Sequence, residues 1–286
     1  MVVPQAWMWC VVASLLNFLR RLLFSLRWYL DHYSKDQLFW WQRIREHVHR
    51  RNFAGAHSIA MVALTHYPRS LFLLNEFGSI ETHLGHFAEA EAAFHRATEG
   101  GVSLATLEHL ATLYLISTRF DDAVSCIQKG IDLETFATQT ESRRSFSWLL
   151  LGQAYRSRGD LSDAIRSLMK AVSIHPMNLR ARIELGLIYE AQLEWRQAHD
   201  QFQFVSEQEE FAEIPGARDL LLLGGLRIMA LEGLIRVRST PQSGELYCPT
   251  AVDSLKAQAQ FVKSRYTNHP PVGWTESWIQ AGSGTE

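Results

Sequence analysis

The side chains best suited to chemistry in this chain are its twelve histidines and three cysteines. Four of the histidines, His47, His49, His83 and His86, are close enough in the sequence to suggest a common site. A metal site needs ligands that converge on one point and a second layer of hydrogen bonds behind them. No carboxylate or cysteine joins these histidines at a recognised ligand spacing. We therefore interpret them as solvated or packing residues and predict no metal site.

The cysteines and the known catalytic motifs give no better candidate. Cys10, Cys126 and Cys248 are far apart and form no CxxC pair, so neither a disulfide framework nor a cysteine zinc site is indicated. The phosphate-binding loop, the GxSxG nucleophile motif and the HExxH metal motif do not occur. The net charge of −2 offers no basic field for nucleic acid. We predict a protein that is not an enzyme, needs no cofactor and binds neither nucleic acid nor a small-molecule substrate.

The elements that must position any binding residues repeat about every 34 residues. The best copy runs from Ser145 to Asn178, and its first residue is counted as position 1. Positions 4, 7, 8 and 11 hold Trp148, Leu151, Gly152 and Tyr155, and positions 20, 24, 27 and 32 hold Ala164, Leu168, Ala171 and Pro176. This order and spacing resembles the tetratricopeptide repeat (TPR) family. Small residues at positions 8 and 20 let two helices approach closely, and proline ends the second helix.

Further copies begin at Gln37, Leu71, Leu104 and Leu179, and a polar insertion, residues 138–144, precedes the best copy. The resemblance implies an all-α fold: a right-handed α-solenoid of about five to six TPR helical hairpins, preceded by an apolar N-terminal helix. We expect the N-terminal helix at 1–33 and five hairpins at 34–212. A degenerate sixth hairpin or cap at 213–271, with helices at 217–237 and 251–271, and a flexible tail at 272–286 complete the expected chain.

The N-terminal segment differs from the repeats. Residues 1–19 carry no charged side chain, and Arg20 and Arg21 follow at once. Trp7, Trp9 and Trp28 stand where interfacial aromatic anchors are expected. We predict that this segment spans or lies on a membrane and that the repeats are on the cytoplasmic side. Three alternatives stay open: packing on the array or on a partner, targeting to an organelle (mitochondrion or plastid), and a cleaved signal.

The resemblance also implies a concave groove lined by the first helix of each hairpin, at positions 2, 5, 6, 9, 12 and 13. None of the copies has the Lys–Asn pair with which some family members hold an acidic C-terminus. We expect a protein partner instead, with a partly apolar peptide or helix as the ligand. Some of the candidates are equally explained as side chains that pack between hairpins. The candidate groove residues are Trp41, Arg45, Asn75, Glu108, Leu149, Leu150, Gln153, Ile183 and Leu187.

A solenoid with such a groove, joined to an apolar segment, favours one function above others. We expect a non-enzymatic adaptor that is held at a membrane and helps to assemble or tether a protein complex. Two alternatives stay open: a permanent structural subunit of a membrane complex, and a soluble chaperone for an apolar segment of a partner.

Overall fold

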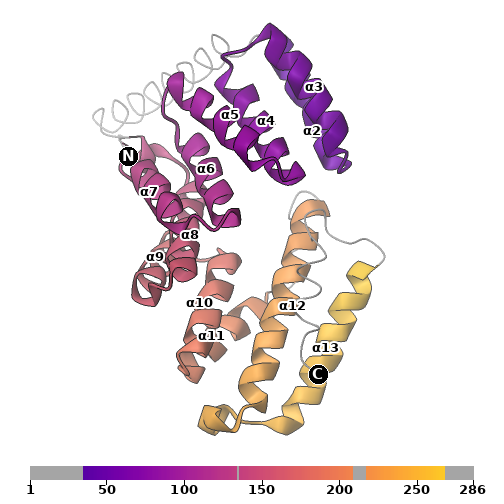
Figure 1. Cartoon of the computed structure of the whole chain (residues 1–286). Coiled ribbons are helices and arrows are strands. Elements are labelled where there is room, and N and C mark those ends of the chain that lie inside the picture. Colours follow the sequence, from indigo (N-terminus) through magenta and orange to yellow (C-terminus); the bar gives the residue numbers. More distant parts are fainter. Residues whose placement is uncertain (1–34, 134, 209–216, 268–286) are drawn as a thin grey trace, which may run out of the picture. The chain divides into compact units, whose positions relative to one another are not determined.

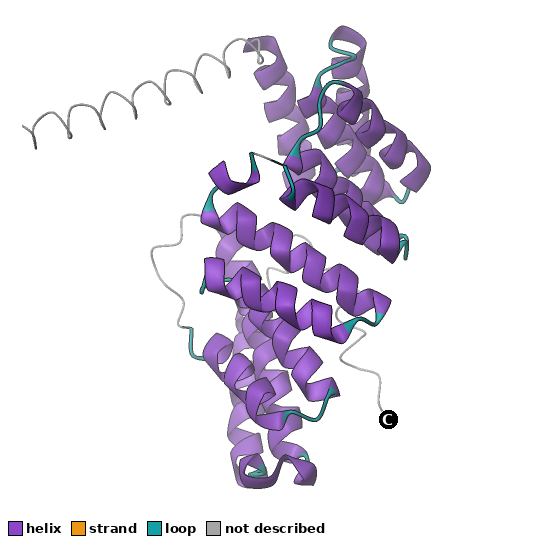
Figure 2. Cartoon of the chain, turned by 90° about the vertical axis from the view of Figure 1, so that its left-hand side faces the viewer, coloured by secondary structure: helices purple, strands orange, loops and turns teal. Residues whose placement is uncertain are grey.

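The structure, a computed structural model, describes residues 35–133, 135–208 and 217–267. The chain divides into two compact units, Met1–Gly100 and Gly101–Glu286. Every regular element in the described residues is a helix (Figure 2). The predicted membrane anchor at 1–33 and the tail at 272–286 lie outside the described residues.

The first unit contains two helical hairpins. Its helices are α2 (Lys35–His49), α3 (Phe53–His66), α4 (Leu71–Leu84) and α5 (Phe87–Glu99). Helix α2 packs on α3, α3 on α4, and α4 on α5, so each helix contacts the next one along the chain. Ile44, Leu73 and Leu74 are at the centre of a core shared by both hairpins. The unit therefore shows the nearest-neighbour stacking of a repeat array.

The second unit continues the same alternation (Figure 1). Paired helices contact each other and then the next pair: α6 with α7, α8 with α9, α10 with α11, and α12 with α13. The bounds are α6 (Leu104–Ile116), α7 (Phe120–Ile131), η1 (Phe136–Thr138), α8 (Glu141–Arg158), α9 (Leu161–Ile174), α10 (Leu179–Ala191), α11 (Trp195–Ser206), α12 (Ala217–Ser239), η2 (Pro241–Leu246) and α13 (Pro249–Thr267).

The first helix of most hairpins begins at a residue whose side chain caps it. Ser70, Ser103, Thr140 and Asn178 precede α4, α6, α8 and α10, and each accepts a hydrogen bond from the backbone N–H three residues on. These bonds satisfy donors that the first helical turn leaves without a partner. The caps therefore fix where each hairpin starts.

The turn inside each hairpin needs one residue with a left-handed backbone. The φ angles are 56° at Arg51, 83° at Gly85, 60° at Thr118, 99° at Gly159 and 62° at Leu193. All five residues occupy position 15 of their repeat copy, so the copies keep one phase. Only two are glycine, the residue that adopts this conformation without steric cost.

Close helix packing explains the glycines at position 8. A Cβ atom on Gly78, Gly152 or Gly186 would lie 2.6 Å from a side-chain carbon of the residue at position 24 of the same copy, which is Phe94, Leu168 or Phe202. Alanine at position 20 is fully buried in all five copies: Ala56, Ala90, Ala123, Ala164 and Ala198. The close helix approach expected at positions 8 and 20 is therefore confirmed, and the residue at position 24 packs against position 8 of its own copy.

The insertion before the best copy forms helical structure. Helix η1 ends at Thr138, and α8 begins at Glu141, which extends this first helix to 18 residues. Helix α12 ends at Ser239, two residues beyond the predicted 237, and α13 begins at Pro249. Among the described helices, none has both the length and the apolar character that crossing a bilayer requires.

Candidate functional site

The first helices of successive hairpins in the second unit, α6, α8, α10 and α12, form the candidate site. Helix α6 contacts α8, α8 contacts α10, and α10 contacts α12. We call the surface made by these four helices the A-helix face. By resemblance to TPR arrays it corresponds to the concave surface, and polar side chains cross it from one helix to the next.

A buried carboxylate anchors the first of these contacts. Glu108 of α6 is only 5 % exposed. Arg143 Nη2 donates to its Oε2 at 2.6 Å, and Ser147 Oγ donates to its Oε1 at 2.7 Å, both from α8. Burial raises the pKa of the Glu108 carboxyl, while the hydrogen bonds from Ser147 and Arg143 offset part of the rise. The arginine is thereby held in one position while much of its side chain remains exposed.

The neighbouring histidine responds to the same environment. Burial lowers the pKa of His109 to about 4, and the positive charge of Arg143 acts in the same direction. The imidazole is therefore neutral at pH 7. Glu108, His109 and Arg143 form one electrostatic group that joins α6 and α8.

Two further carboxylates repeat this arrangement along the A-helix face. Glu184 of α10 is 7 % exposed, accepts a hydrogen bond from Gln153 Nε2 at 2.7 Å and pairs with Arg156 Nη1 at 2.7 Å, both from α8. Glu190 of α10 accepts two hydrogen bonds from Arg236 of α12, at 2.6 and 3.0 Å. In each case the carboxylate is the more buried partner, and the guanidinium group is nearer the surface. The face therefore presents fixed, partly exposed arginines.

The first unit uses an aromatic residue at the corresponding place. Trp41 Nε1 of α2 donates to Glu76 Oε1 of α4 at 3.1 Å, and its ring lies 5.4 Å from that of Phe72. The Arg45 guanidinium is 5.3 Å from the centroid of the Trp41 ring. The predicted groove residues Trp41 and Arg45 are thus together, whereas Asn75 is buried at 6 % exposure.

The apolar groove residues predicted in the second unit are mostly in the core. Leu149, Leu150 and Ile183 are 2 %, 5 % and 1 % exposed. Leu149 packs with Ala164 and Leu168, and Ile183 packs with residues of α11 and α12. Leu187 is half-buried against the same core cluster as Ile183. The A-helix face does expose two apolar side chains, Phe146 of α8 at 39 % and Ile116 of α6 at 52 %.

Sequence reasoning missed Arg143 and Arg236, because neither lies at a groove position of a regular copy. Arg143 belongs to the insertion 138–144, and Arg236 to the degenerate region after residue 212. A signal for Arg143 was present: it precedes Ser147 by four residues and Phe146 by three, the spacings that share a helix face. No comparable signal links Arg236 with Glu190, which are 46 residues apart.

Several histidines of the first unit hydrogen-bond or stack. Glu81 is 1 % exposed, and its two oxygens contact Nδ1 of His57 and Nδ1 of His86. The His83 ring stacks on Phe53 with centroids 4.8 Å apart. In the part of the chain that the structure describes, no three His, Cys, Asp or Glu side chains are arranged to hold a metal ion.

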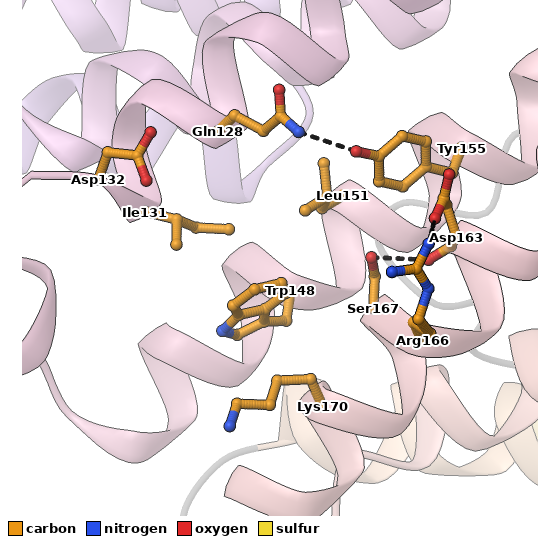
Figure 3. A pocket seen from close by; sticks show the side chains of 10 residues that line it. All are labelled: Gln128, Ile131, Asp132, Trp148, Leu151, Tyr155, Asp163, Arg166, Ser167 and Lys170. Atoms are coloured by element: carbon orange, nitrogen blue, oxygen red, sulfur yellow. Dashed lines mark hydrogen bonds and ion pairs between the residues drawn. The ribbon is translucent and has the colours of Figure 1, made fainter.

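A second surface feature is a hollow of about 620 Å³ lined by residues of α7, α8 and α9 (Figure 3). Gln128 Nε2 donates to Tyr155 Oη at 2.8 Å, and Arg166 pairs with Asp163. Among the described residues, Asp132 and Lys170 have no ion-pair partner, and Trp148 lies between Ile131 and Lys170 in Figure 3. The residues that line the hollow are Gln128, Ile131, Asp132, Trp148, Leu151, Tyr155, Asp163, Arg166, Ser167 and Lys170.

Comparison with known proteins gives a family match over part of the chain and several similar structures. The family model for the TPR repeat matches residues 152–192, and no curated protein matches the chain by sequence. The structure is similar to Pseudomonas aeruginosa PilF, with a TM-score of 0.57, 13 % identity, and coverage of 86 % of this chain and 96 % of PilF. It is also similar to PilW, a type IV pilus biogenesis factor, with a TM-score of 0.57, 16 % identity, and coverage of 78 % and 100 %.

A third similar structure is BtubC from P. vanneervenii, with a TM-score of 0.59, 12 % identity, and coverage of 80 % of this chain and 94 % of that one. At these identities the likeness concerns the fold. The family match covers α8 to α10 in the best copy and its successor, and the hairpins on either side keep the same phase at positions 8, 15 and 20. Residues 152–192 therefore match the TPR repeat, and the described helices have the fold of TPR-like helical repeat proteins.

Proposed function

We propose that the protein is a non-enzymatic scaffold that binds a segment of a partner protein on the A-helix face. In this proposal residues 1–33 hold the scaffold at a membrane, and the bound partner is assembled or tethered into a complex there. The observation that carries the proposal is the exposed Phe146 beside the fixed guanidinium of Arg143.

This pairing suits a partly apolar partner segment. Arg143 and Phe146 are three residues apart on α8, so they are neighbours on one helix face. An apolar partner side chain would bury Phe146, and an oxygen acceptor of the partner would meet the guanidinium of Arg143 or Arg156. Because Glu108 and Glu184 already hold these arginines, binding loses little side-chain entropy.

The membrane part of the proposal rests on the uncharged run to Leu19 followed by Arg20 and Arg21. Membrane fractionation of the full chain and of residues 34–286 tests it. We expect the full chain in the membrane fraction and the shorter chain in the supernatant. Sedimentation of 34–286 with protein-free vesicles would contradict the anchor.

The partner site is tested by affinity purification with mass spectrometry. Phe146→Glu should reduce recovery of the partner, because the new charge would be buried against an apolar ligand. Arg156→Ala should also reduce it, because the partner would lose a hydrogen-bond donor. Met169→Glu is the matched control, since Met169 is 55 % exposed on α9 and not on the A-helix face. Equal recovery with Phe146→Glu and Met169→Glu, with helical circular dichroism unchanged, would refute this site.

A further inference from the structure

The junction between two consecutive repeat copies is closed by one side chain at two places in the array. In the first unit, Arg96 is at position 26 of its copy, and its Nη2 donates to the Pro68 carbonyl, at position 32 of the preceding copy, at 3.1 Å. Between the fourth and fifth copies, Arg182 Nε donates to the Pro176 carbonyl, again at position 32, at 3.0 Å. The Arg182 guanidinium also lies 3.7 Å from the centroid of the Phe204 ring, at position 26. In both junctions the arginine therefore covers the gap between copies.

The junction between the third and fourth copies has no such closure. Position 32 of the third copy is Thr135, and its carbonyl accepts from Thr138 Oγ1 at 2.7 Å and from Gln139 Nε2 at 3.3 Å, both at the insertion. Lys170 is at position 26 of the fourth copy, and within the described residues it has no hydrogen-bond or ion-pair partner. The insertion therefore occupies the carbonyl that would close this junction, and the hollow of about 620 Å³ lies here.

The polar groups in one half of the hollow already have partners. Tyr155 Oη accepts from Gln128 Nε2 at 2.8 Å, and Arg166 pairs with Asp163. Ser167 Oγ donates to the carbonyl of Asp163 at 2.8 Å, within α9. This half, which is the side of Tyr155 and Arg166 in Figure 3, therefore offers a ligand no unpaired charge.

The other half of the hollow combines an apolar wall with three polar groups that have no partner among the described residues. The groups are the indole N–H of Trp148, the ammonium group of Lys170 and the carboxylate of Asp132. Trp148 and Ile131 are half-buried, whereas Lys170 and Asp132 are exposed. In Figure 3 the indole nitrogen of Trp148 faces this half and points away from Tyr155. Two donors and one carboxylate thus surround the Trp148 ring and Ile131.

These groups define the chemistry of a ligand. A carboxylate would accept from Trp148 Nε1 and Lys170 Nζ, and an apolar side chain would cover the Trp148 ring and Ile131. Asp132 would attract a basic group and repel a second acidic one. A hollow of about 620 Å³ is in the range that holds a drug-sized ligand, so a short peptide fits. Charge complementarity therefore favours a peptide with one acidic and one basic side chain.

We propose that the hollow binds a segment of a partner protein in which an apolar residue stands between an acidic and a basic one. Trp148 and Lys170 hold the acidic side chain, and Asp132 faces the basic one. This site is separate from the A-helix face. Helix α8 contributes its positions 4, 7 and 11 to the hollow, whereas its positions 2, 9 and 12 belong to the A-helix face on the opposite side of the helix.

Titration of the full chain with a synthetic tripeptide tests the site. The tripeptide is lysine–leucine–glutamate, acetylated and amidated at its ends, and the indole N–H signals are followed in two-dimensional proton–nitrogen spectra. The signal of Trp148 is identified as the one that Trp148→Phe lacks. We expect a saturable shift of this signal with a Kd of about 1 mM or below. No shift at about 10 mM tripeptide would overturn the proposal.

Two matched tripeptides test the chemistry of the ligand. Glutamine in place of glutamate removes the charge, and alanine in place of leucine removes most of the apolar side chain. Each change should weaken binding by about threefold or more, because an ion pair or buried apolar area is lost. Equal affinity of all three tripeptides would contradict the proposed recognition.

Substitutions of two lysines locate the contact. Lys170→Glu should weaken binding of the lysine–leucine–glutamate tripeptide by about fivefold or more, because its carboxylate then meets a like charge. Lys129→Glu is the matched control: Lys129 is at position 26 of the third copy, is exposed on α7 and does not line the hollow, so the Kd should not change. The fold should persist in both, since both side chains are exposed. An equal effect of the two substitutions, or no effect of Lys170→Glu, would overturn the proposal.

Two further measurements separate this site from its alternatives. Free leucine carries a carboxylate, an ammonium group and an apolar side chain in one small molecule, and it should shift the Trp148 signal less than the tripeptide does at the same concentration. Tighter binding of free leucine would show a site for a small molecule and overturn the peptide. Phe146→Glu, on the A-helix face, should leave the affinity for the tripeptide unchanged. A loss of affinity in this variant would place the tripeptide on the A-helix face and overturn the site in the hollow.

Discussion

Gly152 and Leu168 are in such close contact that a Cβ atom on the glycine would lie 2.6 Å from Leu168 Cγ. Leu168 is fully buried, and the Ala164 carbonyl oxygen is 3.3 Å from the same point, so neither neighbour has space to move away. The two helices of this hairpin therefore depend on the missing side chain. The same relationship joins Gly78 to Phe94 and Gly186 to Phe202.

Gly152→Leu should destabilise the protein by about 1–3 kcal/mol or more, because an overpacked contact forces the helices apart. Even Gly152→Ala should be destabilising, although alanine has the higher helix propensity. Thermal unfolding followed by circular dichroism measures both. Gly100→Ala is the control, because the nearest atom to its Cβ would be 3.7 Å away, an ordinary contact. If Gly152→Ala unfolds at the wild-type temperature, the close packing is not as described.

Leu193→Gly should stabilise the protein by about 1 kcal/mol. Leu193 has a φ of 62° and is 65 % exposed, so glycine relieves backbone strain and removes little packing. The reverse change at the same position of the preceding copy, Gly159→Leu, should be destabilising by a similar amount. Urea unfolding measures both, and a loss of stability in Leu193→Gly would contradict the strain.

Arg143→Ala should cost about 1–3 kcal/mol at pH 7, because Glu108 would be left buried without its cation. The cost should shrink as the pH falls, since the pKa of Glu108 is raised by burial and the carboxyl then becomes neutral within the folded protein. Urea unfolding of wild type and Arg143→Ala at several pH values gives the difference in their free energies of unfolding. A difference that does not vary with pH would show that Glu108 is not the group that Arg143 stabilises.

His109 should make the protein acid-sensitive. Its pKa is about 4 in the folded chain, against an ordinary value of 6.5, so the unfolded chain binds the proton more readily. Stability is therefore complete above pH 6.5 and is lost as the pH falls from there towards 4. In His109→Asn the loss over this range should be smaller by about 1–3 kcal/mol. If the free energies of unfolding of wild type and His109→Asn fall in parallel between pH 6.5 and 4, His109 is not the source of the acid sensitivity.

The sequence by itself determined the repeat, its phase and the residues that pack inside each hairpin. These contacts are local: positions 8, 20 and 24 face one another because the turn at position 15 brings the two helices back on each other. The spacing alone therefore predicts that a small residue at position 8 or 20 lies where the two helices of a hairpin touch. The sequence also showed that residues 1–33, which lie outside the described residues, differ in kind from the array.

The tertiary structure decided which side chains remain open to a partner. Leu149 and Ile183 occupy groove positions by their spacing, yet neighbouring hairpins cover them. Arg143 and Arg236 lie outside the regular copies, yet they bind Glu108 and Glu190 of α6 and α10. Such contacts depend on how one hairpin is stacked and rotated on the next, which is set by the packing of many side chains together and not by the spacing within a single copy.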